Sequence, residues 1–117
     1  MTTINLQIGS KTFAVKLSDH ASSRALLAML PMTVTMRELN GNEKYYQMPN
    51  RLPTNSQDVG TIKTGDLMLY GSDTLVLFYK SFRTSYSYTK LGYIEDVSGL
   101  ANELGSGSVQ VTLSLAL

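Results

Sequence analysis

The feature that most constrains the fold is an alternation of apolar and polar residues with a period of two, present at both ends of the chain. Near the N-terminus the apolar positions are Ile4, Leu6 and Ile8, followed by Phe13, Val15 and Leu17. Near the C-terminus they are Val109, Val111, Leu113 and Leu115. A period of two is typical of a strand with one buried face. Gly9 and Ser10 separate the first two runs and suit a type II′ turn, so the sequence predicts an opening hairpin and a closing strand.

The middle of the chain holds two continuous apolar runs, residues 67–70 and 75–79, joined by a short polar turn. Continuous runs indicate strands that are covered on both faces, here by a barrel interior and by capping helices. A further alternating strand starts directly after Pro31, at Met32. Residues 40–66 are rich in glycine, proline and asparagine, and we expect a long loop there, interrupted at most by a strand over residues 44–48.

Two short helices are expected. The first covers residues 19–30, with Ser18 or Asp19 as its N-cap. The second covers residues 96–104, with Asp96 as its cap and Gly105 as its stop. About eight strands and two short helices within 117 residues predict an all-β, closed antiparallel barrel of about eight strands with two capping helices. We expect one domain over residues 1–117.

Composition excludes several functions. There is no cysteine and a single histidine, so disulfides, thiolate metal sites, cysteine nucleophiles and multi-histidine metal sites are excluded. A net charge of +1 argues against a nucleic-acid partner, and no apolar run is long enough for a membrane helix. We therefore expect no metal, cofactor, nucleic acid or membrane.

No leader segment is visible, which predicts a cytoplasmic protein, or an exported one if a leader was removed. The oligomeric state stays open.

Several segments resemble the bacterial cyclophilin-like domain family, a group of uncharacterised proteins. The most specific are Leu-Asn-Gly-Asn-Glu-Lys-Tyr-Tyr at residues 39–46 and Gly-Asp-Leu-Met-Leu-Tyr-Gly at residues 65–71. Leu-Phe-Tyr-Lys-Ser-Phe at 77–82 and Leu-Gly-Tyr-Ile at 91–94 extend the similarity. The resemblance implies a cyclophilin-type barrel with a helix over each open end. It also implies that Phe78 or Tyr79 forms an aromatic wall of a groove.

True cyclophilins are prolyl isomerases that use an arginine, a Phe-Met-x-Gln-Gly-Gly run, a tryptophan and a histidine. This chain has no tryptophan and no Phe-Met-x-Gln run, and its one histidine, His20, precedes the first predicted helix. Most of the isomerase pattern is therefore missing.

The strongest candidate site is an aromatic segment with basic residues. Between residues 74 and 94 there are three bases, Lys80, Arg83 and Lys90, and no acid. The candidate ligand-binding residues are Tyr70, Phe78, Tyr79, Phe82, Arg83, Tyr86 and Tyr88. Aromatic faces would receive apolar or proline side chains, while the guanidinium would donate to a carbonyl or carboxylate. The alternative is that these rings simply pack in the barrel, as aromatic residues do in many sheets.

Three hypotheses follow. The first is a binding module without catalytic activity that holds a peptide or small ligand in an aromatic groove. The second is a weak peptidyl-prolyl isomerase, with Arg83 as the donor to the prolyl nitrogen. The third is a small-molecule enzyme or a subunit of an amide-hydrolysing system, since cyclophilin-like barrels occur there. We interpret Glu38 and Glu43 as loop charges, and Asp19, His20, Ser22 and Ser23 as helix-capping residues rather than a catalytic triad.

Overall fold

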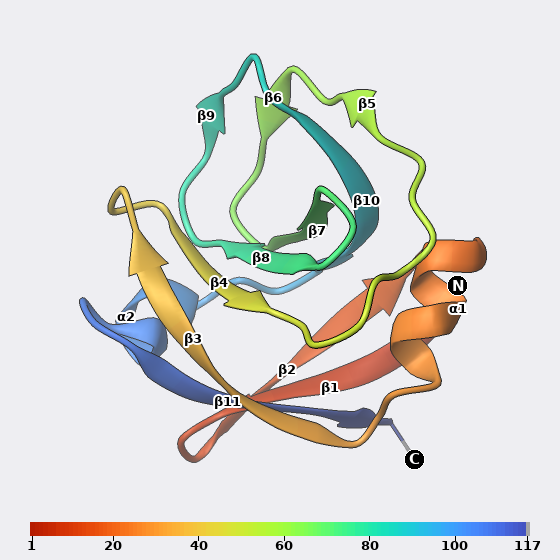
Figure 1. The fold of residues 1–117 in the computed structure, drawn as a ribbon. Coiled ribbons are helices and arrows are strands. Elements are labelled where there is room, and N and C mark those ends of the chain that lie inside the picture. Colours follow the sequence, from red (N-terminus) through yellow and green to blue (C-terminus); the bar gives the residue numbers. More distant parts are fainter. Residues whose placement is uncertain (117) are drawn as a thin grey trace.

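Eight antiparallel strands of five to eight residues form a closed barrel in the computed structural model, which describes residues 1–116 (Figure 1). They are β1 (Thr2–Ile8), β2 (Lys11–Leu17), β3 (Met32–Leu39), β4 (Glu43–Gln47), β7 (Asp66–Tyr70), β8 (Thr74–Phe78), β10 (Ser87–Ile94) and β11 (Val109–Leu115). Their order is β2-β1-β11-β3-β4-β8-β7-β10, and pairing of β10 with β2 closes the barrel. The predicted all-β antiparallel barrel is confirmed.

The opening hairpin and the closing strand lie side by side. β1 pairs with β2 in full register from Thr2↔Leu17 to Ile8↔Lys11, and its other edge pairs with β11. Gly9 has a φ of 59°, the left-handed value that the first position of a type II′ turn needs. The two alternating segments predicted from the sequence therefore form one continuous part of the barrel wall.

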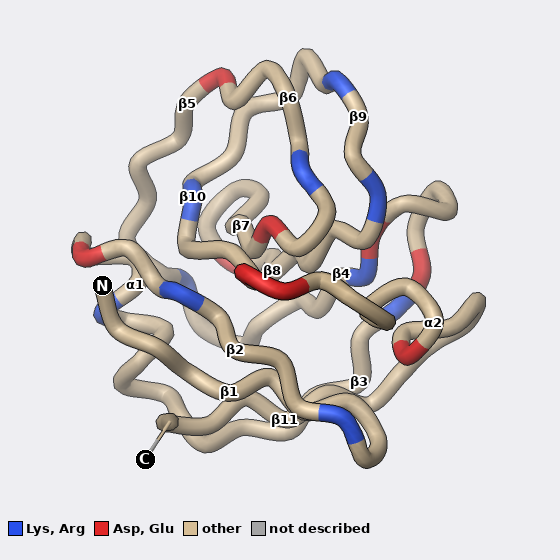
Figure 2. Tube along the Cα trace, turned by 180° about the vertical axis from the view of Figure 1, so that it is seen from behind, with Lys and Arg blue, Asp and Glu red and all other residues tan. Residues whose placement is uncertain are grey.

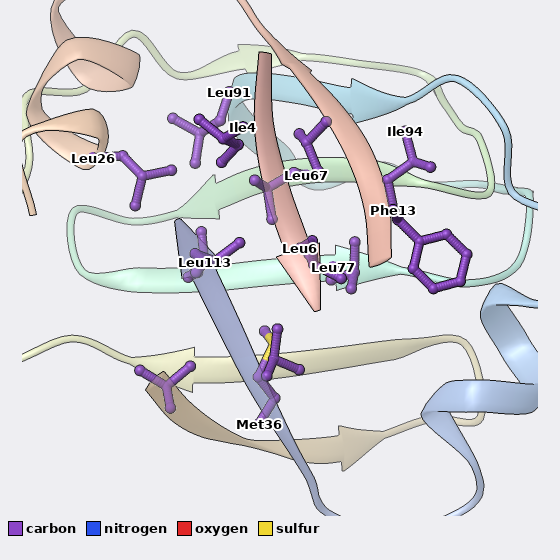
Figure 3. Close-up of a cluster of buried hydrophobic side chains, with 14 of the residues drawn as sticks. Ile4, Leu6, Phe13, Leu26, Met36, Leu67, Leu77, Leu91, Ile94 and Leu113 are labelled. Carbon is purple, nitrogen blue, oxygen red and sulfur yellow. The ribbon is translucent and has the colours of Figure 1, made fainter. Parts of the chain in front are cut away.

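The core lies inside the barrel, where alternate side chains of every long strand meet (Figure 3). Ile4 and Leu6 of β1 point toward Leu67 of β7 and Leu77 of β8, and all four are at most 1% exposed. Because these residues come from opposite walls, the interior is filled by side chains and leaves no channel through the barrel.

Three two-residue strands form an arm on the outside of the barrel (Figure 1). β5 (Gln57–Asp58) pairs with β10, and β6 (Thr61–Ile62) pairs with β9 (Phe82–Arg83). We call residues 48–63 and 80–86 the outer arm. The region expected as a long loop over residues 40–66 contains the strand expected at residues 44–48, which is β4, and also β5 and β6, which were not expected. Strands of two residues are too short to show an alternation of apolar and polar residues in the sequence.

The outer arm covers a second apolar cluster, which lies on the outer face of β7, β8 and β10. Its buried members are Ile62, Met68, Val76, Phe78 and Tyr88, and Tyr45, Val59 and Phe82 pack against them. This cluster explains why the runs at 67–70 and 75–79 are apolar on both faces. The outer cover was expected to be helical, and it is formed by the arm instead.

The two helices are shorter than predicted and lie on opposite sides of the barrel (Figure 1). α1 is Ala21–Leu27, and its N-cap is His20, whose ring accepts from the backbone N–H of Ser23. α2 is Leu100–Leu104, and its N-cap is Gly99, without a side-chain cap. The predicted caps Ser18, Asp19 and Asp96 are therefore wrong. Asp19 pairs with Arg24, and Asp96 accepts from the backbone N–H of Ser98.

Candidate functional site

A cavity of about 550 Å³ opens on the outer face of the barrel, between the β4–β8–β7–β10 sheet and the outer arm. We call it the outer cavity. Its lining residues come from the β3–β4 turn, the sheet and the arm: Leu39, Asn40, Asn42, Glu43, Tyr45, Tyr70, Thr74, Val76, Phe82, Arg83, Thr84, Ser85, Tyr86 and Tyr88. It brings together segments that are more than 40 residues apart in the chain, so only the folded barrel creates it.

Tyrosine rings form one side of the outer cavity. The centroid of Tyr70 lies 6.1 Å from that of Tyr86, with the rings edge to face, and 5.6 Å from that of Tyr88. Tyr86 is 62% exposed and Tyr70 48% exposed, whereas Tyr88 is buried. Exposed aromatic rings that contact one another form a surface on which flat or apolar groups can stack.

Arg83 supplies the positive charge of the outer cavity. It lies on β9, where it pairs with Thr61 of β6, and its side chain is exposed. Within residues 1–116 its guanidinium makes no ion pair. Figure 2 shows Lys and Arg positions along β6, β9 and β10, where acidic positions are few. The guanidinium is therefore available to a ligand that carries a carboxylate or carbonyl group.

Of the seven predicted site residues, the structure brings five to the outer cavity: Tyr70, Phe82, Arg83, Tyr86 and Tyr88. Phe78 does not line it. This ring is fully buried beneath the cavity, 5.7 Å from the ring of Phe82 and 5.5 Å from that of Tyr88. It supports the two rings that line the cavity and cannot itself meet a ligand there.

Tyr79 lies away from the outer cavity. The register Glu43↔Phe78 places Phe78 on the outer face, so the next residue turns to the other side. There the Tyr79 hydroxyl donates to Glu38 at 2.6 Å, and Lys44 Nζ lies 5.5 Å from the ring centroid. The resemblance implied that Phe78 or Tyr79 lines the groove, and in this geometry neither does.

Sequence reasoning missed several polar residues of the outer cavity, among them Glu43 and Asn42. Glu43 was interpreted as a loop charge, but it begins β4 and is only 7% exposed. Burial raises the pKa of its carboxyl, and the negative charge of Glu38 raises it further. The neighbouring Asn42 has a buried Oδ1 that no donor meets. The signal that could have identified Glu43 is the alternation of Glu43 and Tyr45, which share one face of β4.

Glu43 and the tyrosine side of the outer cavity influence each other. The pKa of Tyr88 is raised to about 12, first by burial and second by the negative charge of Glu43. The carboxylate of Glu43 and the hydroxyl of Tyr88, which line the same cavity, therefore interact electrostatically. Tyr88 therefore stays protonated at neutral pH and keeps a hydroxyl that can donate.

A second cavity of about 380 Å³ lies at the other side of β10, among Lys63, Asp66, Lys90 and Tyr93. Burial raises the pKa of Asp66, while the backbone N–H of Lys63 donates to it at 2.9 Å and lowers the pKa in part. None of the seven predicted site residues lines this cavity. The carboxylate of Asp66 is already held by the turn that starts β7.

No metal centre accompanies these cavities within residues 1–116, since no three His, Asp or Glu side chains converge there. In the same part of the chain, no helix is both long and apolar enough to cross a membrane.

The comparison with protein families agrees with the barrel. A family model described as the cyclophilin-like family matches residues 6–114, almost the whole chain. The chain belongs to the cyclophilin-like family. The resemblance inferred from residues 39–46 and 65–71 is thereby confirmed at the level of the family.

Among solved structures, the chain is similar to the solution structure of a hypothetical protein from Archaeoglobus fulgidus. The two are 20% identical, the similarity covers 98% of this chain and 95% of that one, and the TM-score is 0.64. This likeness supports the fold alone. Because that protein is archaeal, the expectation of a bacterial family is not confirmed. No curated protein matches this chain.

Proposed function

We propose that this cyclophilin-like protein is a binding module without catalytic activity, which holds a peptide or small ligand in the outer cavity. The observation that carries the proposal is the convergence of exposed tyrosine rings and an unpaired guanidinium on one cavity. Its volume of about 550 Å³ lies within the roughly 300–1,000 Å³ that is common for ligand sites.

The chemistry of the lining suggests how a ligand is held. Tyr70 and Tyr86 offer ring faces to apolar, proline or aromatic groups, and their edge-to-face contact fixes both rings. Arg83 offers a planar fork of donors to a backbone carbonyl or a carboxylate. Phe78 is buried behind Phe82 and Tyr88 and supports the rings of these two residues.

The test is a nuclear magnetic resonance titration of ¹⁵N-labelled protein with a panel of short capped peptides. We expect at least one peptide to shift the amide signals of residues 42–45, 70 and 82–88. We expect Arg83→Ala and Tyr86→Ser to weaken that binding about five- to tenfold. Tyr93→Ser is the matched control, because Tyr93 is similarly exposed (40%) but lines the other cavity. Shifts confined to the second cavity would contradict the proposal.

The alternative is a weak prolyl isomerase, favoured by the single observation that Arg83 stands beside the aromatic rings of the outer cavity. Isomerisation crosses a barrier of about 18–20 kcal/mol, which a donor to the prolyl nitrogen in an apolar pocket lowers. In a protease-coupled assay on a proline peptide we expect little or no turnover. Strong turnover that Arg83→Ala abolishes would establish the isomerase instead, with Tyr93→Ser again as the control.

A further inference from the structure

Glu43 is a buried acid without a partner. Its side chain is 7% exposed, and within residues 1–116 no hydrogen bond or ion pair reaches its carboxylate. An ionised carboxylate that loses part of its hydration without gaining a partner is destabilised, and largely buried acids in folded proteins are usually paired. The oxygens of Glu43 are not among the fully buried unpaired atoms, so the carboxylate stays open to the cavity. Glu43 lines the outer cavity, so a ligand bound there can donate a hydrogen bond to its carboxylate.

The lysine next to Glu43 in the sequence is directed elsewhere. Lys44 follows Glu43 on β4 and therefore points to the opposite face. Its Nζ lies 3.0 Å from Glu38 and donates to the carbonyl oxygens of Gly105 and Gly107 at 2.8 and 2.6 Å. Lys44 is thus fully occupied, and the charge of Glu43 stays without compensation.

Asn42 adds a second acceptor beside Glu43. Its Oδ1 is buried, has no hydrogen-bond partner and belongs to a residue that lines the same cavity. A carboxylate and an amide oxygen on consecutive residues are acceptors only, and both lack donors. A group that carries several N–H donors would satisfy the carboxylate, and it would reach the shielded Oδ1 once the Asn42 amide turns toward the cavity.

The aromatic surroundings suit such a group when it is positively charged. Tyr45, Phe82 and Tyr88 line the same cavity as Glu43, and the faces of aromatic rings attract cations. Arg83 carries the same charge as the expected group, but it is exposed on the outer arm, where water and salt screen it.

We propose that the outer cavity recognises an organic cation, a protonated amine or a guanidinium on a peptide or small molecule, which donates to Glu43 and Asn42 between the aromatic rings. Arg83 then takes a carbonyl or carboxylate of the same ligand. This inference rests on the proposed function and specifies its ligand class.

The proposal makes binding depend on pH. Glu43 interacts electrostatically with Tyr88 of β10 on the cavity side, and with Glu38 of β3 and Tyr79 after β8 on the opposite side, where Lys44 is paired with Glu38. The other titratable or charged residues that line the cavity are Tyr45, Tyr70, Arg83 and Tyr86. Tyr79 and Tyr88 stay neutral, since the pKa of each is raised to about 12. As pH falls through the raised pKa of Glu43, the carboxylate takes up a proton and loses its attraction for a cation.

The experiment compares two probes, Nα-acetyl-lysine N-methylamide and Nα-acetyl-norleucine N-methylamide, which has a similar side chain without the ammonium. Affinities are measured by titration of ¹⁵N-labelled protein between pH 4.5 and pH 8. We expect the lysine probe to bind at least tenfold more tightly at pH 7.5. We expect Glu43→Gln to remove that preference and its pH dependence, and Asn42→Ala to weaken binding two- to fivefold. Glu95→Gln, at an exposed acid, is the control.

The outcomes separate the two proposals. If the norleucine probe binds in the outer cavity as well as the lysine probe, or if Glu43→Gln changes nothing, the cation proposal is wrong and the binding module stands. If neither these probes nor any peptide of the panel shifts the lining residues, both are wrong. Because the amide spectrum reports folding directly, a variant that unfolds is recognised at once, and the pH series of the wild-type protein then decides.

Discussion

At the scale of single residues, Glu43 and Lys44 are neighbours on β4 whose side chains point to opposite faces of the strand. Glu38 of β3 lies on the side of Lys44. Lys44, fully buried, is satisfied by Glu38 and two backbone carbonyls, and Tyr79 completes this group on the side away from the outer cavity. Glu43, one residue earlier, faces the outer cavity without a partner. Neighbours in the sequence thus have opposite surroundings, because Lys44 is paired and Glu43 has no hydrogen-bond or ion-pair partner within residues 1–116.

The first prediction concerns the stability cost of Glu43. The pKa of Glu43 is higher in the folded protein than in the unfolded chain. The folded protein therefore loses stability as pH rises from the unfolded pKa to the folded pKa, and it regains that stability as pH falls. We expect Glu43→Gln to raise the free energy of unfolding at pH 7.5 by about 1 kcal/mol, because it removes a buried charge. Urea unfolding at pH 7.5 and pH 4.5 measures this. A gain that is equal at both pH values would contradict the explanation, and Glu95→Gln serves as the reference.

At the scale of elements, α1 is fixed to the barrel through its cap. The His20 ring accepts from the backbone N–H of Ser23 and contacts the carbonyl oxygen of Lys90 on β10 at 2.7 Å. One side chain therefore caps a seven-residue helix and connects it to the wall. Asp19, one residue earlier, instead pairs with Arg24.

The second prediction follows from this double role. His20→Ala removes both interactions and is expected to lower the free energy of unfolding by about 1–2 kcal/mol, the usual range for a lost cap with an added hydrogen bond. His20→Asn keeps a capping side chain but cannot span to β10, so it should restore part of the loss. Thermal and urea unfolding measure both variants. An alanine variant as stable as the wild type would show that the cap is dispensable.

At the scale of the whole molecule, the barrel closes at one narrow contact. β10 meets β2 through three residue pairs, Gly92↔Leu17, Tyr93↔Lys16 and Ile94↔Val15. Its other edge pairs with β7 on both sides of a register shift between Lys90 and Gly92. A Cβ placed on Gly92 would collide with the carbonyl oxygen of Lys16 and lie 3.1 Å from the Cα of Leu17. Closure therefore requires glycine there.

The third prediction tests this closure. Gly92→Ala should lower the free energy of unfolding by about 2–3 kcal/mol, because backbone atoms of β2 must move to admit the methyl group. Gly107→Ala is the control, since a Cβ there has nothing within 4 Å. Hydrogen exchange of the β2 and β10 amides should increase in Gly92→Ala only. Exchange that is unchanged at this seam would mean that the barrel closes without the close approach.

The sequence by itself determined the barrel. The alternation at residues 4–17 and 109–115, the turn at Gly9 and the double-sided apolar runs at 67–70 and 75–79 are local patterns, and each strand has the face they predict. The segment 39–46 likewise indicated the family. These features are visible in a sequence because side-chain direction in a strand depends only on odd or even position.

The tertiary structure decided the outer arm, the helix caps and the site. β5, β6 and β9 are too short to show a period, and they are held by distant strands. Tyr79 was indistinguishable from Phe78 until the pairing of Glu43 with Phe78 fixed which of them faces outward. Glu43 looked like a loop charge because burial and the absence of a partner depend on what the folded chain places around it. Pairing across the barrel, which no local pattern encodes, therefore determined which polar groups a ligand can meet.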